Sequence, residues 1–186
     1  MAKVKKNATR VAILIAVAGM IFSSLGLTLV LLFQSDNTDT TQSDQAKLQQ
    51  QIQEQQQKEA SMPKEPLPGY EATSFDPASV TELKVETLKQ GDGPAAVKES
   101  TVTANYFGWT SDGKIFDSTN KGGTITPIPF PLSQVIKGWT DGLTGVNQGS
   151  VVKLTIPGDQ AYGNTDNGDG RPFGPLVFIV ELTEVK

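Results

Sequence analysis

The pattern of hydrophobic and polar positions divides the chain into three parts. Residues 11–33 are apolar without a single charge, residues 34–79 are polar or proline-rich, and residues 80–186 alternate between apolar and polar positions. Alternation with a period of two is typical of β-strands that bury one face. The globular domain is therefore expected at residues 80–186.

Several segments of this domain follow the strand pattern, and Gly-containing turns separate them. In the last of them, Leu176, Phe178, Val180 and Leu182 share one face. The fourth is interrupted by two prolines, which weakens it as a strand. The predicted strands are residues 83–88, 101–106, a short one opening at 115, 125–130, 151–156 and 176–185.

One segment between the strands has helical spacing. A short helix is expected from about Gln134 to Asp141, with Ser133 as its N-terminal cap and Gly142 at its end. Val135, Ile136 and Trp139 then share a face, because positions three and four apart lie together.

A helix of about two turns is not stable alone in water, so this one must pack on the sheet. The predicted fold is α+β, with a mostly antiparallel sheet that has one helix-covered face and one polar face. On composition alone, Trp139 is most simply a core residue.

The first 33 residues predict a membrane anchor. Residues 1–10 hold four basic side chains and no acidic one. At about 1.5 Å per residue, residues 11–33 can cross the ~30 Å hydrocarbon core as a helix. A cleaved signal peptide is the alternative, but its apolar region usually has about 7–15 residues and a small-residue cleavage site. We expect an uncleaved single-pass anchor in the cytoplasmic membrane, with the basic tail inside and the carboxyl end outside.

Residues 34–79 are expected to act as a linker. The first half is rich in glutamine, and the second half contains four prolines. Low hydrophobicity argues against a packed core, and proline favours stiff, extended chain.

Composition excludes several classes of chemistry. The net charge is −4, so no nucleic-acid partner is expected. The chain has neither cysteine nor histidine, which excludes disulfides, thiolate or histidine catalysis and the usual zinc sites. The loop from Asp166 to Gly170 lacks the glutamate that an EF-hand requires at its twelfth position, where Val177 stands. No metal or cofactor is expected.

Six motifs stand in order along residues 83–185. They are Gln90–Gly93 (QGDG), Tyr106–Gly108 (YFG), Asp112–Ser118 (DGKIFDS), Val135–Trp139 (VIKGW), Ala161–Gly163 (AYG) and Leu176–Leu182 (LVFIVEL). Several are weak singly, but the order and spacing together are specific. In this combination the domain resembles the FKBP-type peptidyl-prolyl cis–trans isomerases.

The resemblance implies a bent antiparallel sheet wrapped around one short helix, with an apolar cleft between them. It also implies a role for particular residues. Trp139 would form the floor of the cleft, Asp117 would lie at its edge, and the Tyr162 hydroxyl would donate to a substrate carbonyl. The implied catalytic residues are Asp117, Tyr162, Phe116 and Trp139, and the implied substrate-binding residues are Tyr106, Phe130, Val135, Ile136 and Phe178.

Two regions depart from the family pattern. Ile128 stands where the family often has an aromatic residue, and the segment after Tyr162 lacks the usual apolar tip, for which Phe173 is a candidate. These departures bear on substrate preference more than on the reaction.

The implied function is isomerisation of prolyl bonds in exported proteins at the outer face of the membrane. Partners implied are proline-containing polypeptides and macrolides such as FK506 and rapamycin, with the protein a monomer. Rotation about a prolyl bond needs no nucleophile, general base or metal, which suits a chain without histidine or cysteine. A non-catalytic proline-binding or chaperone module is the main alternative, and a structural stalk protein is a third.

Overall fold

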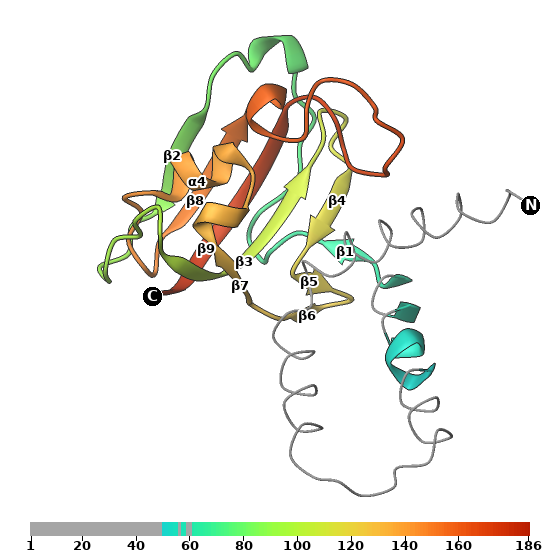
Figure 1. The fold of residues 1–186 in the computed structure, drawn as a ribbon, viewed down its shortest axis with the longest axis horizontal. Helices are drawn as coiled ribbons and strands as arrows, with labels where there is room; N and C mark the ends of the chain where they lie inside the picture. Colours follow the sequence, from blue (N-terminus) through green and yellow to red (C-terminus); the bar gives the residue numbers. More distant parts are fainter. Residues whose placement is uncertain (1–49, 56, 59–60) are drawn as a thin grey trace, which may run out of the picture. The chain divides into compact units, whose positions relative to one another are not determined.

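The computed structural model describes residues 50–55, 57–58 and 61–186 (Figure 1). All the strands of the described residues lie in one compact unit that begins at Glu54 and ends at Lys186. The predicted tail and anchor, residues 1–33, lie outside the described residues. In the part of the chain that is described, no helix combines the length and the apolar character needed to cross a membrane.

The compact unit is built on antiparallel strands, as the alternating pattern predicted. The main sheet has the order β2-β8-β9-β3-β4, and β7 pairs with the first half of β3. A small second sheet has the order β1-β5-β6. The bounds are β1 Lys64–Glu65, β2 Lys84–Lys89, β3 Thr101–Trp109, β4 Ile115–Ser118, β5 Asn120–Lys121, β6 Thr124–Ile125, β7 Ile128–Pro131, β8 Val151–Ile156 and β9 Leu176–Val185.

Most predicted strands are confirmed, and the proline-containing one is corrected. Strands β8 and β9 match their predicted ranges, and β3 continues beyond the predicted end to Trp109. The strand predicted over residues 125–130 is instead divided into β6 and β7, with Thr126 and Pro127 between them. Within the described part of the chain, β7 pairs only with β3, and a strand with one free edge accepts proline, so Pro129 and Pro131 are tolerated.

The predicted helix exists but begins later than expected. Helix α4 runs from Lys137 to Leu143 and follows a 3-10 turn at Leu132–Gln134. Ser133 lies in that turn, so the predicted cap is wrong, and Ile136 occupies the cap position without a side-chain hydrogen bond. The core fixes this turn, because Leu132 is fully buried and its N–H donates a 3.0 Å hydrogen bond to the carbonyl of Ser100.

Two glycines allow α4 to lie directly against β8. A methyl group on Gly138 would lie 2.3 Å from Cγ2 of Ile156, and one on Gly142 would lie 2.9 Å from Cδ2 of Leu154. Gly142 was predicted to end the helix, but the helix continues past it to Leu143. Its role is close packing, which also holds the short helix in place.

The main core lies between α4 and the facing side of the sheet. The predicted face of β9 is confirmed, because Leu176, Phe178, Val180 and Leu182 all belong to this core. Trp139 and Leu143 approach it from the helix, and both are buried. Burial of these side chains provides the main drive for folding.

The opposite side of the sheet is not polar, which corrects the prediction. It carries a second buried cluster that includes Phe107, Trp109, Val177 and Ile179. The covering residues come from a segment before β2, residues 63–75, which we call the strap. Leu67 of the strap is 4% exposed, and Tyr70, Ala72 and Phe75 pack on the same cluster.

The strap belongs to the region predicted as linker. Its first residues form β1, which pairs with β5, and further along the carbonyl of Thr73 accepts a 2.9 Å hydrogen bond from Nε1 of Trp109. Residues 63–75 therefore differ from a free spacer, and the compact unit begins before the predicted boundary at residue 80. Isolated apolar residues among prolines carry no periodic signal, which is why the pattern missed them.

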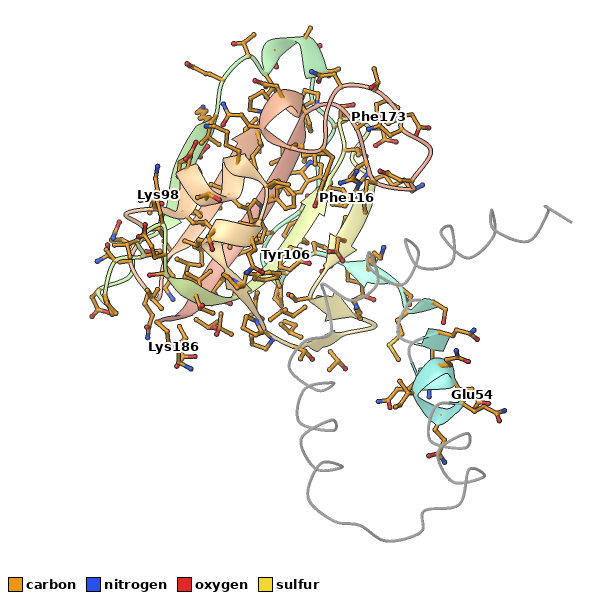
Figure 2. All side chains as sticks on the ribbon, viewed as in Figure 1. Glu54, Lys98, Tyr106, Phe116, Phe173 and Lys186 are labelled. Atoms are coloured by element: carbon orange, nitrogen blue, oxygen red, sulfur yellow. The ribbon has the colours of Figure 1, made fainter. Side chains whose placement is uncertain are left out.

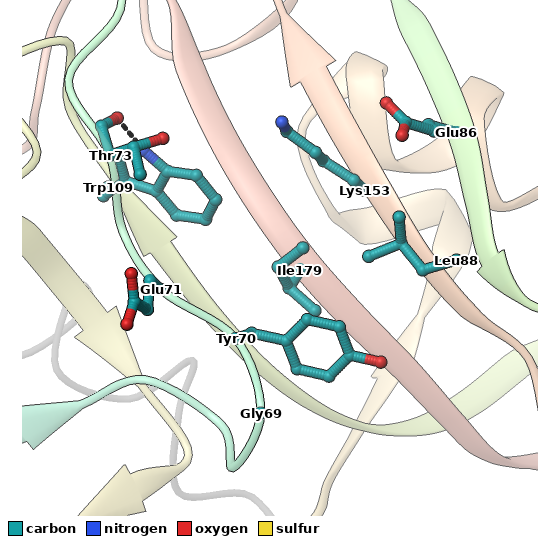
Figure 3. A pocket seen from close by; sticks show the side chains of 9 residues that line it. All are labelled: Gly69, Tyr70, Glu71, Thr73, Glu86, Leu88, Trp109, Lys153 and Ile179. Atoms are coloured by element: carbon teal, nitrogen blue, oxygen red, sulfur yellow. Dashed lines mark hydrogen bonds between the residues drawn. The ribbon is translucent and has the colours of Figure 1, made fainter.

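A hollow of about 570 Å³ lies beside the strap on this second face. Figure 3 shows Ile179 between Trp109 and Leu88, with Tyr70 below it and Lys153 above it in this view. None of the predicted site residues lines it. The predicted site must therefore be sought on the helix side of the sheet.

Candidate active site

Trp139 lies at the centre of an aromatic cluster on the helix side of the sheet. It is 4% exposed, and three rings meet it edge to face. The ring centroids of Tyr106, Phe130 and Phe178 lie 5.2, 5.4 and 5.4 Å from that of Trp139. These geometries are the favourable ones for aromatic pairs. Strands β3, β7 and β9 and helix α4 thus each contribute one ring.

The indole N–H of Trp139 is an unusual feature of this cluster. It is buried and has no hydrogen-bond partner among the described residues. A buried donor without a partner is costly and uncommon in native structures.

A ring of partly exposed side chains surrounds the buried base. Phe116 meets Phe178 edge to face at 5.5 Å. Phe130, Val135, Ile136 and Tyr162 also pack on the same core while remaining partly exposed. The result is an accessible apolar surface with a rigid aromatic base, which suits a small apolar ring such as that of proline.

Asp117 is held at the edge of this surface by two hydrogen bonds. The hydroxyl of Tyr106 donates to Oδ2 at 2.5 Å, and the N–H of Ser118 donates to Oδ1 at 2.9 Å. Burial raises the pKa of Tyr106 well above its usual value, and the charge of Asp117 adds to the effect. Tyr106 therefore stays protonated and fixes the carboxylate.

Tyr162 has a different environment from Tyr106. Its hydroxyl makes no hydrogen bond within the described residues. Burial raises the pKa of Tyr162, the charge of Asp117 raises it further, and the charge of Arg171 acts in the opposite direction. The group is thus a neutral, unengaged donor at physiological pH.

Arg171 is a neighbour of the site that the sequence analysis did not identify. Its guanidinium carbon lies 5.5 Å from the centroid of the Tyr162 ring, a distance typical of cation–π contacts. An ion pair with Asp169, 2.6 Å between Nη2 and Oδ2, holds the guanidinium in place. No local pattern predicts a contact across the intervening glycine-rich loop.

Phe173 lies on the same loop, as Figure 2 shows, and is 51% exposed. The structure thus brings eight of the nine predicted site residues into one apolar cluster, with Asp117 bonded to its edge through Tyr106. Their roles in binding and catalysis remain predictions.

Comparisons with known proteins show which family the chain resembles. The profile of a family described as FKBP-type peptidyl-prolyl cis-trans isomerase matches residues 93–183. The FK506-binding protein of Neisseria meningitidis serogroup B is 39% identical over 104 residues, which cover 55% of this chain and 95% of that protein. The chain belongs to the FKBP-type peptidyl-prolyl cis–trans isomerase family.

Two further relatives define the extent of the similarity. The FKBP-type peptidyl-prolyl cis-trans isomerase FkpA of Escherichia coli K12 is 41% identical over 108 residues, or 58% of this chain. That match spans only 39% of FkpA. A crystal structure of a peptidyl-prolyl cis-trans isomerase from Pseudomonas syringae pv. tomato has a TM-score of 0.50 and 33% identity, covering 81% of this chain and 99% of that one. The predicted FKBP-like fold is confirmed.

Proposed function

We propose that this protein catalyses cis–trans isomerisation of prolyl bonds in polypeptides. The carrying observation is the partly exposed apolar surface over Trp139, with Asp117 fixed at its edge and an unengaged Tyr162 hydroxyl beside it. The bound proline ring would lie on the aromatic base. The carbonyl before the proline would accept a hydrogen bond from Tyr162.

The chemistry follows from this surface. Rotation about the prolyl bond has a barrier of about 18–20 kcal/mol, because it breaks amide resonance. In the twisted state the carbonyl is less polar, so an apolar environment favours it over the planar ground state. Tyr162 supplies a donor that stays neutral, since its pKa is raised. No covalent or proton-transfer step is required.

We propose further that residues 11–33 anchor the protein in the cytoplasmic membrane and leave the isomerase domain outside. The support is the uncharged 11–33 segment and the basic residues that precede it. Clients would then be exported polypeptides. Protease added to intact cells should remove the domain, and protection until lysis would refute this topology.

The catalytic proposal is tested with the purified full chain. The protein should accelerate isomerisation of a peptide that contains a Leu-Pro bond, a step that takes tens to hundreds of seconds without a catalyst. Asp117→Leu and Tyr162→Phe should lower kcat/KM while the thermal transition stays cooperative. FK506 should inhibit the reaction and raise the Tm, because it binds only the folded state.

The same measurements separate the alternatives. Binding of FK506 without catalysis would favour a proline-binding module. Absence of both would favour a structural stalk protein and refute the isomerase.

A further inference from the structure

Strand β4, which carries Phe116 and Asp117, is the end strand of the main sheet. Among the described residues it pairs only with β3, over a short register that is irregular between Gly108 and Trp109. An end strand with one short ladder has few bonds that define its position. The site nevertheless needs β4 to have a precise position relative to β3.

The surroundings of Gly108 in β3 show how little space separates β3 from the rings of the site. A methyl group on Gly108 would lie 2.4 Å from Cε1 of Phe178 and 2.8 Å from Cζ of Phe116. The two rings therefore lie directly on the backbone of β3, without space between them. A small displacement of β4 would move Phe116 out of the aromatic surface and would shift Asp117 relative to Tyr106.

The strap forms hydrogen bonds with β4 and with the residues that follow it. Lys64 donates through Nζ to the carbonyl of Phe116 at 2.5 Å, and the Ser118 hydroxyl donates to the carbonyl of Glu65 at 2.6 Å. Asn120 donates through Nδ2 to the carbonyl of Pro66 at 2.8 Å. Figure 1 shows β1 next to β4 and β5. These bonds involve residues on both sides of Asp117.

The Ser118 bond is the best protected of the three. Ser118 is 1% exposed, so water cannot replace the strap carbonyl as its partner. Its oxygen also accepts from the N–H of Asn120 at 2.9 Å. One hydroxyl thus ties the strap to the end of β4 and the start of β5.

We infer that the strap is a positioning element of the active site, acting through Lys64, Ser118 and Asn120. It holds Phe116 and Asp117 in their working geometry and touches no substrate itself. The strap lies before residues 93–183, the range that the family profile matches. The inference deepens the proposed function, on which its activity test rests.

The test compares four variants of the full chain with the parent. Ser118→Ala removes the buried bond, and Lys64→Met removes the exposed one while keeping the aliphatic stem. Lys64→Arg retains a donor and is the conservative rescue. Val151→Ala is the matched control, because Val151 is 4% exposed in the second core and takes no part in the strap bonds.

We expect kcat/KM to fall about fivefold in Ser118→Ala, the factor that corresponds to one hydrogen bond. In Lys64→Met, kcat/KM should fall about twofold, since exposed hydrogen bonds are weaker. In Lys64→Arg, kcat/KM should equal that of the parent. Val151→Ala should lower the Tm without changing kcat/KM at 25 °C. Should Ser118→Ala fail to fold, the two Lys64 variants decide.

Unchanged kcat/KM in Ser118→Ala and Lys64→Met would overturn the inference. So would a loss in Val151→Ala equal to that in Ser118→Ala, because activity would then follow stability. A parent without activity would refute the proposed function, not the strap. In that case the Kd for FK506, read from tryptophan fluorescence, should weaken in Ser118→Ala and Lys64→Met, and equal affinities would refute the strap's role.

Discussion

Two tyrosines of the site are expected to respond differently to the same substitution. Tyr106 donates a 2.5 Å hydrogen bond to Asp117, whereas the Tyr162 hydroxyl has no partner within the described residues. Tyr106→Phe therefore removes a bond that folding forms. Tyr162→Phe removes a group that we assign to the substrate.

The magnitudes follow from these environments. A hydrogen bond to a charged group contributes about 1.5–3 kcal/mol, and the lower end applies because Asp117 keeps its bond from Ser118. For a unit of this size, about 1.5 kcal/mol corresponds to a Tm decrease of about 5 °C. Tyr162→Phe should change the Tm by about 2 °C or less, because its hydroxyl has no internal bond to lose.

The effects of the two substitutions on kcat/KM should have the reverse order of their effects on the Tm. If the Tyr162 hydroxyl binds the carbonyl more strongly in the twisted state, its loss should lower kcat/KM about tenfold, since about 1.4 kcal/mol is a factor of ten. Tyr106→Phe should lower kcat/KM less, because Asp117 keeps one contact.

The assay pairs thermal unfolding with isomerisation of a Leu-Pro peptide for the parent and both variants. Equal Tm decreases in the two variants would refute the assignment of the hydroxyl groups. Full kcat/KM in Tyr162→Phe would refute its role in the reaction.

Three further predictions concern packing and pH. Trp139→Ala should abolish activity and lower the unfolding free energy by about 3–5 kcal/mol, measured by denaturant titration, because it removes a large buried ring; a stable but inactive variant would contradict this. Gly138→Ala should destabilise by about 1–3 kcal/mol despite the helix preference for alanine, since its methyl group would meet Ile156, whereas Lys137→Ala on the exposed face should be nearly neutral. The raised pKa of Tyr106 means that the folded state holds this proton more tightly than the unfolded chain, whose value is about 10. The associated stability is complete below about pH 10 and is lost as the pH rises through the folded pKa, so the Tm should decline above about pH 10 less steeply in Tyr106→Phe than in the parent. Parallel declines would show that other groups control alkaline unfolding.

The strands were predictable where one face alternates cleanly. Strands β8 and β9 agree with their predicted ranges because each buries alternate residues in the main core. The second face of the sheet could not be predicted, because Val177 and Ile179 are also apolar and the alternation does not show what covers them. Their cover comes from the strap, far from them in the sequence.

The helix start could not be predicted for a related reason. Ser133 has the right side chain for a cap, but Leu132 is anchored by the core and by a bond to Ser100. A tertiary contact thus outweighs the local preference. The site residues were predicted from the resemblance to the family, whereas Arg171 and the strap bonds depend on contacts between distant segments.

The place of β9 in the sheet has a consequence for how the chain folds. Strand β9 lies between β8 and β3, yet it follows both in the sequence. During synthesis the β2–β8 pair and the β3–β4 pair remain unconnected until residues 176–185 emerge. The sheet therefore closes late and through pairings of large sequence separation, which slows folding and leaves two strand edges exposed to aggregation in the meantime.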